Sequence, residues 1–295
     1  MNKLRAIELF VRLADLGSFT RVADEFNSSK SFISKEISRL EEETGARLIH
    51  RSTRSLQLTE IGEGYLARCR KLLLQMEDAD SFIQDMQGAP KGKLKVNAPM
   101  TLGLTDMGRA FADFMVAYPD IEIDMHLSDE PVDLIENGFD LGFRVASRQF
   151  DSQYIGKKIC HFSYQICASP AYLEKHSYLK SPADLLLHNC FVYSYFRGGN
   201  VWPLEDGIQV KGNLRVNSTI FMIDCIRQGL GIGFLPDFAA RTALRKGDIV
   251  EILAEHEKPQ LTFYAMYPER QHVPPKLTHC IEFMQKWFRD SFSYG

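Results

Sequence analysis

The stretch SSKSFISKEISRLEEETG, residues 28–45, presents two different faces at helical spacing. Ile33, Ile37 and Leu40 recur every three or four residues, which predicts the side of a helix that packs inside a domain. The other side carries short hydroxyl groups and lysines, namely Lys30, Ser31, Ser34, Lys35 and Ser38. Serine is a mediocre helix former, but short donors and acceptors suit a helix that enters the major groove of DNA. Taken alone, these residues are equally consistent with an ordinary solvated helix face.

The residues before this helix predict two shorter elements and a tight turn. An apolar stripe that begins at Leu4 indicates a first helix, and Ser18 is positioned to cap a second. Asn27 stands where the turn needs a left-handed backbone, a conformation that asparagine tolerates. Ser29 is expected to cap the third helix, and Gly45 to end it. The order of these elements is a helix-turn-helix pattern.

The segment from Arg47 to Thr59 is basic and contains no acidic residue. Leucines on both sides of RSTRS predict a two-stranded wing. Arg47, Arg51 and Arg54 are expected to contact phosphates or the minor groove at the edge of a duplex. Surface solubility is the alternative explanation for the arginines, although a wing explains their clustering better. Arg51 has a second alternative, an ion pair with a glutamate inside the domain.

Thr59 is expected to cap a long helix that runs to about Gln87. Its apolar residues recur in alternating steps of four and three, at Tyr65, Cys69, Leu72, Met76, Ala79 and Ile83. This is the period of a coiled coil, so the pattern predicts that two chains pair along the helix. The alternative is that the stripe packs on the helix's own domain.

From residue 94 onward, the pattern changes to alternating strands and helices, as in α/β domains. KLKVNAP, IEIDMHLS and DLGFRV predict parallel strands, and residues 101–118 and 131–137 predict the helices between them. Later strands are expected at 154–168, CFVYSY, IQVKGNLRVNS, GIGFLP, DIVEIL and LTFYAMYP, and later helices at SPAYLEKH, SPADLLLH, 218–228 and 275–292.

Two hydroxyl residues follow strands at the starts of predicted helices, Thr101 after NAPM and Ser218 after RVN. Helix N-termini offer free N–H groups and the positive end of a dipole, so two of them facing each other suit a small anion such as a carboxylate. Arg144 stands at the end of DLGFR, and its place in such a site comes from a family resemblance, which implies that it would pair with an acidic group of the ligand. Plain helix capping explains either hydroxyl equally well, and a salt bridge within the protein explains the arginine.

Composition excludes several other classes of protein. Hydrophobic residues make up 45% and charged residues 25% of the 295 residues, and the net charge is −3, so a DNA-binding site must be local rather than global. No apolar run reaches membrane-spanning length, and we expect a cytoplasmic protein with reduced thiols. The six cysteines and eight histidines fit no zinc signature. No nucleotide-binding loop or hydrolase motif is present, so neither an enzyme nor a cofactor or metal is expected.

The chain resembles the LysR-type transcriptional regulators over essentially its whole length. The most specific part is FTRVADEFNSSKSFISKEISRLEEETGARLIHRSTRSLQLTEIG; LSDEPVDLIENGFDLGFRV, CASPAYLEKH, LRVNST and GLGIGFLPDF resemble effector-domain segments of that family. Two residues depart from the family's pattern, Phe32 where a small residue is commoner and Asn27 where glycine is.

The resemblance implies an α+β multidomain fold in three parts. These are a winged helix-turn-helix domain (1–58), a linker or dimerisation helix (59–88) and a two-lobed α/β effector domain (89–295) that resembles periplasmic binding proteins. Lobe I is expected at about 91–161 and 266–295, and lobe II at about 162–265. The DNA-binding residues would be Ser29, Lys30, Ser31, Phe32, Ser34, Lys35, Ser38, Arg51, Thr53 and Arg54, and the effector-binding residues Met100, Thr101, Leu102, Arg144, Ser218, Leu235 and Pro236.

The function expected from the resemblance is ligand-responsive regulation of transcription. A homodimer assembling to a homotetramer would bind an approximate palindrome in double-stranded DNA. A small, anionic effector between the lobes would modulate binding or bending. A DNA-binding repressor that needs no ligand is the first alternative, and an enzyme built on the α/β lobes is the second. Thermal stabilisation by small carboxylates would separate the first from the leading interpretation.

Overall fold

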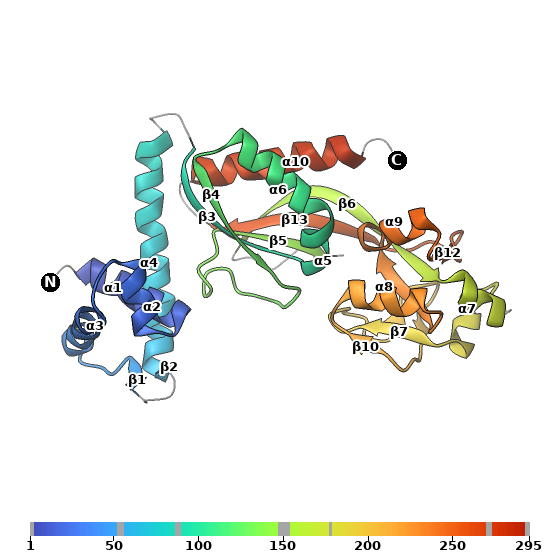
Figure 1. Ribbon diagram of the computed structural model, residues 1–295, viewed down its shortest axis with the longest axis horizontal. Helices are drawn as coiled ribbons and strands as arrows, with labels where there is room; N and C mark the ends of the chain where they lie inside the picture. Colours follow the sequence, from blue (N-terminus) through green and yellow to red (C-terminus); the bar gives the residue numbers. More distant parts are fainter. Residues whose placement is uncertain are drawn as a thin grey trace. The chain divides into compact units, whose positions relative to one another are not determined.

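The computed structural model describes residues 3–51, 56–85, 90–146, 154–176, 179–269 and 273–292 (Figure 1). The chain divides into two compact units. The first comprises Met1–Ala89, Val132–Asp140 and Arg270–Pro275, and the second comprises Pro90–Pro131, Leu141–Glu269 and Lys276–Gly295. Among the described residues, no helix is long and apolar enough to cross a membrane, and no three His, Cys, Asp or Glu side chains gather as metal ligands would.

The first unit begins with three helices, α1 (Lys3–Leu16), α2 (Phe19–Glu25) and α3 (Lys30–Thr44). The expected caps are present, because the hydroxyl of Ser18 accepts from the backbone N–H of Arg21, and α3 ends at left-handed Gly45 with φ of 66°. Asn27 has φ of 47°, which confirms the left-handed turn between α2 and α3. The apolar stripes of these helices meet in one core, whose fully buried members are Ala6, Leu9, Phe10, Leu13, Val22, Ile33, Ile37 and Leu40.

The wing and the long helix continue this unit. Strands β1 (Ile49–Arg51) and β2 (Leu56–Leu58) pair antiparallel, which confirms the two-stranded wing. Helix α4 (Glu60–Asp85) begins directly after Thr59, whose hydroxyl donates to the carbonyl of Arg47 and accepts from the N–H of Gly62. The start of α4 lies so close to the wing that a Cβ on Gly62 would be 2.1 Å from the carbonyl oxygen of Leu48. Glycine is therefore required at this position.

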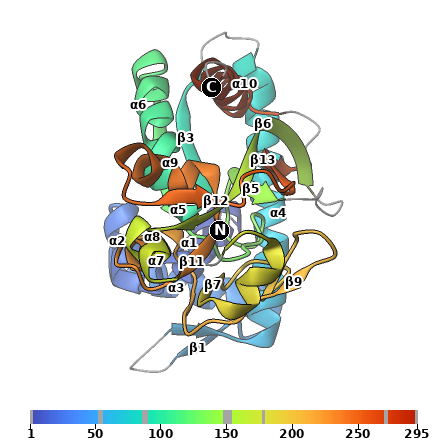
Figure 2. The same ribbon diagram turned by 90° about the vertical axis from the view of Figure 1, so that its right-hand side faces the viewer.

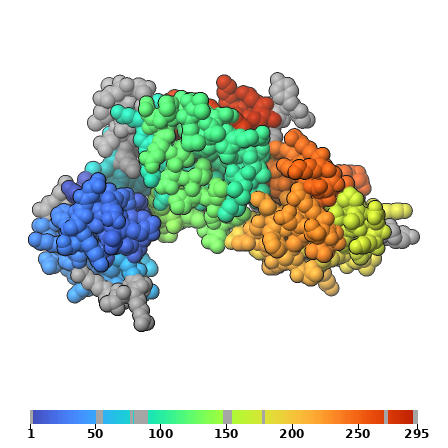
Figure 3. Space-filling view, in the orientation of Figure 1, coloured from blue at the N-terminus to red at the C-terminus, as the bar shows by residue number. Residues whose placement is uncertain are grey.

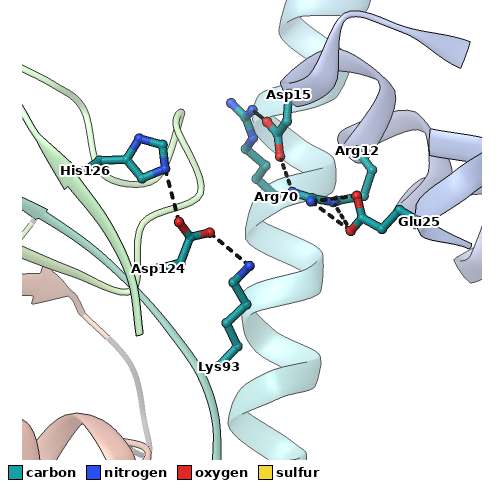
Figure 4. Close-up of polar contacts among 7 residues, drawn as sticks. All are labelled: Arg12, Asp15, Glu25, Arg70, Lys93, Asp124 and His126. Carbon is teal, nitrogen blue, oxygen red and sulfur yellow. Dashed lines mark hydrogen bonds and ion pairs between the residues drawn. The ribbon is translucent and has the colours of Figure 1, made fainter. Parts of the chain in front are cut away.

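An ionic network joins α1, α2 and α4 (Figure 4). The guanidinium of Arg12 contacts Glu25 at 2.8 Å and Asp15 at 3.3 Å, and Arg70 of α4 donates to the other oxygen of Asp15. The side chains of Arg70 and Asp15 are only 11% and 15% exposed, so water screens their attraction less than that of a surface pair. The network fixes the first half of α4 to the helical domain.

The second unit is built on a nine-stranded mixed sheet in the order β10-β7-β11-β6-β13-β5-β3-β4, with β12 also paired to β6. Strands β3 (Gly92–Ala98), β4 (Ile121–Leu127) and β5 (Leu141–Ala146) are mutually parallel around β3, as expected. Strand β13 (Gln260–Pro268) runs antiparallel to β5 and to the first part of β6 (Tyr154–Ala168). We call this half of the sheet, with its helices, lobe I. The ion pair between Lys93 of β3 and Asp124 of β4 ties these strands together at the surface, and the ring of His126, also on β4, lies 3.4 Å from the same carboxylate (Figure 4).

One face of lobe I is covered by helices α6 (Gly108–Ala117) and α10 (Pro275–Phe292) (Figure 1). Phe114 of α6 meets Phe283 of α10 edge to face, and the indole N–H of Trp287 donates to Asp113 at 2.8 Å. Phe288 packs on Phe263 of β13, with ring centroids 5.1 Å apart. Helix α6 follows α5 (Met100–Leu102) and the π-helical turn η1 (Gly103–Met107), so residues 100–117 form one helical segment with a π turn inside it.

Lobe II is the other half of the sheet and faces the viewer in Figure 2. The end of β6 pairs with β11 (Ile232–Pro236) and β12 (Val250–Ile252), and β11 continues to β7 (Cys190–Tyr193) and β10 (Arg215–Val216). The remaining elements are α7 (Pro170–Lys175), η2 (Pro182–Leu187), α8 (Thr219–Arg227), α9 (Asp237–Lys246) and the hairpin of β8 (Val201–Trp202) and β9 (Ile208–Gln209). Trp202 and Tyr164 both stack on Phe234 at the centre of this lobe.

Two expectations about the α/β part of the chain are wrong. Residues 131–137 form turns rather than a helix, because Pro131 and the side chain of Asp133, which accepts from the N–H of Glu136, favour a local turn. IQVKGNLRVNS splits into β9 and β10. Strand β13 pairs with β5 from Thr262 onward, and the boundary between the lobes expected near 265 remains a prediction.

Gly62 and Gly64 of α4 provide a matched test of the close approach between the helix and the wing. At Gly64 a Cβ would have ordinary contact, 3.6 Å from the guanidinium of Arg68, so Gly64→Ala should stabilise the helix by up to about 1 kcal/mol. In Gly62→Ala, the new Cβ would push the backbone of α4 away from the carbonyl group of Leu48. This variant should therefore destabilise the first unit by about 1–3 kcal/mol. Urea titration followed by far-UV circular dichroism measures both.

Tryptophan fluorescence is the internal control, because Trp202 and Trp287 both lie in the second unit. Its transition should be unchanged in both variants. Equal stability of Gly62→Ala and Gly64→Ala would contradict the close approach.

Candidate functional site

The polar face of α3 is exposed, and its opposite face is buried. Lys30, Ser31, Phe32 and Lys35 are exposed, while Ser34 and Ser38 are partly exposed. Ile33, Ile37 and Leu40 on the other side have no accessible surface. The two-faced pattern of residues 28–45 therefore holds in the structure, and tertiary packing compensates for the weak helix propensity of serine.

The serines of α3 make two kinds of hydrogen bond, one that caps the start of the helix and one within it. The hydroxyl of Ser29 caps the helix by accepting from the N–H of Phe32 at 3.1 Å and lies 2.9 Å from the hydroxyl of Ser31. Ser38 donates to the carbonyl of Ser34 within the helix. Lys30 and Lys35 make no ion pair in the part of the chain that the structure describes, so both ammonium groups are available for phosphates or bases.

The structure adds one cation to this face that the sequence pattern did not indicate. The guanidinium of Arg5, on α1, lies over the ring of Phe32 at 5.9 Å from its centroid. This cation–π contact helps to fix the ring of Phe32, which is a large apolar side chain on an otherwise polar face. Arg51 lies at the end of β1, but its side chain is outside the described part, as are Thr53 and Arg54. The expected contacts of the wing tip remain predictions.

Two threonines join the lobes of the second unit. The hydroxyls of Thr101 in α5 and Thr219 at the start of α8 are 2.5 Å apart, and both residues are buried. Figure 3 shows the green surface of the residues just after 100 against the orange surface that includes α8. Ser218 acts as the N-cap of α8 by accepting from the N–H of Phe221. Thr219, which the sequence pattern did not single out, is thus the residue that meets Thr101.

Arg144 is a partly buried cation near the same place. Its Nη1 donates to Oδ1 of Asn97 at 2.5 Å and to the carbonyl of Phe143 at 2.7 Å. Its Nη2 is buried and makes no hydrogen bond within the described part of the chain. Burial lowers the pKa of Arg144, against the opposing charges of Asp129 and Tyr154. The second nitrogen therefore presents an unused donor in a desolvated position, which is costly for the protein alone.

The carboxylate of Asp129, just after β4, collects donors from both lobes. It accepts from the backbone N–H of Met100 at 2.9 Å and from the hydroxyl of Tyr193, at the end of β7 in lobe II. Burial raises the pKa of Asp129, and its two hydrogen bonds and the charge of Arg144 only partly offset that effect. Burial, together with the charge of Asp129, raises the pKa of Tyr193. Asp129 was not among the residues that the sequence indicated.

The other expected effector residues differ in accessibility. Met100 is 36% exposed, and Pro236 is partly buried at the start of α9. Leu102 and Leu235 have no accessible surface. Both side chains belong to the hydrophobic core in this structure, and their assignment as lining residues of an effector site remains a prediction.

The stripe on α4 also separates into two parts. Cys69 is buried, and Tyr65 packs on the ring of Phe10, so these two residues belong to the core of their own domain. Leu72 and Met76 are 41% and 38% exposed, and Ala79 is exposed as well. The side chain of Ile83 lies outside the described part. Tyr65 and Cys69, the first two positions of the expected seam, therefore pack inside their own domain. Pairing of two chains along the exposed residues from Leu72 onward remains a prediction.

Comparison with known proteins identifies the family to which this arrangement of domains belongs. Residues 4–63 match the family model of the bacterial regulatory helix-turn-helix protein, lysR family, and residues 87–289 match the LysR substrate binding domain. An uncharacterised HTH-type transcriptional regulator of Haemophilus influenzae is 32% identical over 94% of this chain and 98% of its own. A probable HTH-type transcriptional regulator, LtrA, of Klebsiella pneumoniae is 31% identical over 97% and 95%.

Among solved structures, CrgA, a LysR-type transcriptional regulator from Neisseria meningitidis, aligns with a TM-score of 0.62 at 27% identity, covering 96% of this chain and 97% of its own. The chain belongs to the LysR family of bacterial transcriptional regulators. It is a DNA-binding regulator with an effector-binding domain, and the family is one of regulators rather than enzymes.

Lys35→Ala and Ser34→Ala should weaken specific DNA binding without unfolding the protein, because both side chains lie on the accessible face of α3. Loss of one base contact costs about 1–3 kcal/mol and relaxes the preference for the site. Gel shifts with the operator and a scrambled duplex measure both effects, with Lys71→Ala, an exposed lysine of α4, as the control for charge. Unchanged affinity of both α3 variants for both duplexes would exclude α3 as the reading helix.

Proposed function

We propose that this regulator reads its DNA site through the polar face of α3 and the wing, and that a small carboxylate or other anion bound near Arg144 modulates that binding. The observation that supports an anionic effector is the buried Nη2 of Arg144, which has no hydrogen-bond partner in the described part of the protein. A guanidinium binds carboxylates through two parallel hydrogen bonds. In Arg144, Nη1 is already committed to Asn97, so an acidic group has Nη2 as its open donor.

The position of Arg144 also suits control of the relation between the lobes. Asn97 and Arg144 belong to β3 and β5 of lobe I, while Tyr193 and Thr219 reach the same region from lobe II. Asp129 and Thr101 each bond a lobe II side chain. A ligand that changed these hydrogen bonds would favour one arrangement of the lobes over another, which is the requirement for an effector.

The small DNA-reading surface of one chain favours assembly of the protein into dimers. One winged helix-turn-helix contacts a short half-site, which discriminates poorly among genomic sequences. Two linked copies gain affinity through effective concentration. The exposed residues Leu72, Met76 and Ala79, spaced by four and three, supply an apolar row for pairing with a second copy of α4. We therefore expect a homodimer on an approximate palindrome, two of which join into a homotetramer in the cytoplasm.

The effector assignment is tested by thermal shift with a panel of small carboxylates at constant ionic strength. A ligand that binds only the folded protein raises the melting temperature, by an amount that grows with its concentration. Arg144→Gln should abolish the shift, whereas Arg245→Gln, an exposed arginine of α9, should retain it.

The outcomes separate the alternatives. Absence of any shift in the wild type would favour the repressor that needs no ligand. A full increase in melting temperature in Arg144→Gln would show that Arg144 does not bind the effector. Chemical turnover of the acid would instead indicate an enzyme.

Dimerisation through α4 is tested by replacing Leu72 and Met76 together with glutamate. Like charges facing each other across the seam should dissociate the dimer, and sedimentation velocity would show a smaller species. Leu74→Glu is the control, because Leu74 is a partly exposed leucine of the same helix on the side opposite the row. Sedimentation of the double variant at the wild-type rate, with full protection of the palindrome, would show that this row is not the contact.

A further inference from the structure

The effector region contains an acidic side chain of the protein itself. Asp129 is a half-buried carboxylate whose oxygen receives the backbone N–H of Met100, the first residue of the helical segment 100–117. The hydroxyl of Tyr193 donates to the same carboxylate, and the charge of Arg144 acts on it. A backbone N–H at a helix start, a phenolic hydroxyl and a guanidinium are the donors that a protein uses to bind a small carboxylate.

The adjacent acid has a different environment. Among the described residues, the carboxylate of Glu130 accepts one longer hydrogen bond, 3.4 Å from the hydroxyl of Tyr195, and the residue is exposed. Asp129 therefore differs from its neighbour in burial and in the number of donors that surround it. The comparison supplies a matched pair, because both acids follow β4 and both bond a tyrosine of lobe II.

Two features indicate that Asp129 is held at some cost. Its burial raises its pKa even though two hydrogen bonds and the charge of Arg144 favour the ionised form. Within the described part of the chain, Nη2 of Arg144 makes no hydrogen bond, although an acid lies close enough for its charge to matter. A free carboxylate, which has no backbone to constrain it, can take up the donors of Asp129 and Nη2 together.

We propose that Asp129 occupies the effector's anion site in the ligand-free protein, and that a small carboxylate activates the regulator by displacing it. Displacement breaks the bond between Asp129 and Tyr193, which is a link between the lobes. The inference rests on the proposed anionic effector. It adds that competition from Asp129 makes the apparent affinity for that effector lower than the intrinsic affinity of the anion site.

Asp129→Ala tests the displacement directly with formate and acetate as probes, since formate has the size of the carboxylate that the substitution removes. Calorimetric titration of the full-length protein at constant ionic strength, with chloride as the balancing anion, gives the dissociation constants. We expect Asp129→Ala to bind either probe at least tenfold more tightly than the wild type. Glu130→Gln should bind as the wild type does. The double variant Asp129→Ala/Arg144→Gln should lose the gain, which a general loosening of the lobes would not explain.

Each other result contradicts the proposal in a distinct way. Wild-type binding with equal or weaker binding by Asp129→Ala would exclude displacement and leave the anionic effector intact. Failure of all variants to bind either probe would contradict both displacement and the anion site. An equal gain in Glu130→Gln would show a general effect of negative charge after β4 rather than occupation of the site by Asp129.

Discussion

The constraint on which the second unit depends is that one strand, β6, belongs to both lobes. Its first part pairs with β13 as far as Ser163, and its last part pairs with β11 from Tyr164 and with β12. The lobes therefore share a continuous backbone at the middle of β6. A change in the angle between them must be absorbed there and in the return connection from β12 to β13. The contacts that bridge the lobes on either side of these connections determine which angle is stable.

Two groups of contacts bridge the lobes, and their strengths differ. Asp106 of η1 is buried and pairs with Arg241 of α9 at 3.3 Å, while Asp237 of α9 accepts from the backbone and hydroxyl of Ser163. Removal of one partner of a buried ion pair costs roughly 3–5 kcal/mol. The second group consists of single hydrogen bonds, between Thr101 and Thr219, between Asp129 and Tyr193 and, at 3.4 Å, between Glu130 and Tyr195. Such bonds contribute about 0.5–1.5 kcal/mol each, or more where one group is charged, which lies within the range that a small ligand can reverse. The ion pair suits a permanent connection, and the second group suits a regulated one.

Residues with local roles were predictable from the sequence, and residues with distant partners were not. Asn27, Ser29 and Gly45 act within a few residues of themselves, so turn and capping chemistry identified them. Thr219, by contrast, is defined by Thr101, which is 118 positions away, and Asp129 by donors from α5 and β7. Helix-terminus reasoning selected Ser218 one position too early, because a capping hydroxyl bonds its own helix rather than the opposite lobe. The acids and tyrosines that link the lobes have no spacing that marks them.

The stripe on α4 shows why a correct period can still assign the wrong partner. Heptad spacing describes one face of a helix, but it does not state whether that face meets a neighbouring chain or the protein's own core. The first half of α4 buries Leu66 and Cys69 in the helical domain, and Leu73 is the last of its described side chains packed on that core. The accessible row at Leu72, Met76 and Ala79 begins where this packing ends, on a helical stretch too short to be stable in water by itself. A second copy of α4 would bury that row, so the same helix that is anchored to one domain at its start requires a partner at its end. Pairing of the DNA-reading domains would then follow from the folding of α4 rather than from contacts between the domains themselves.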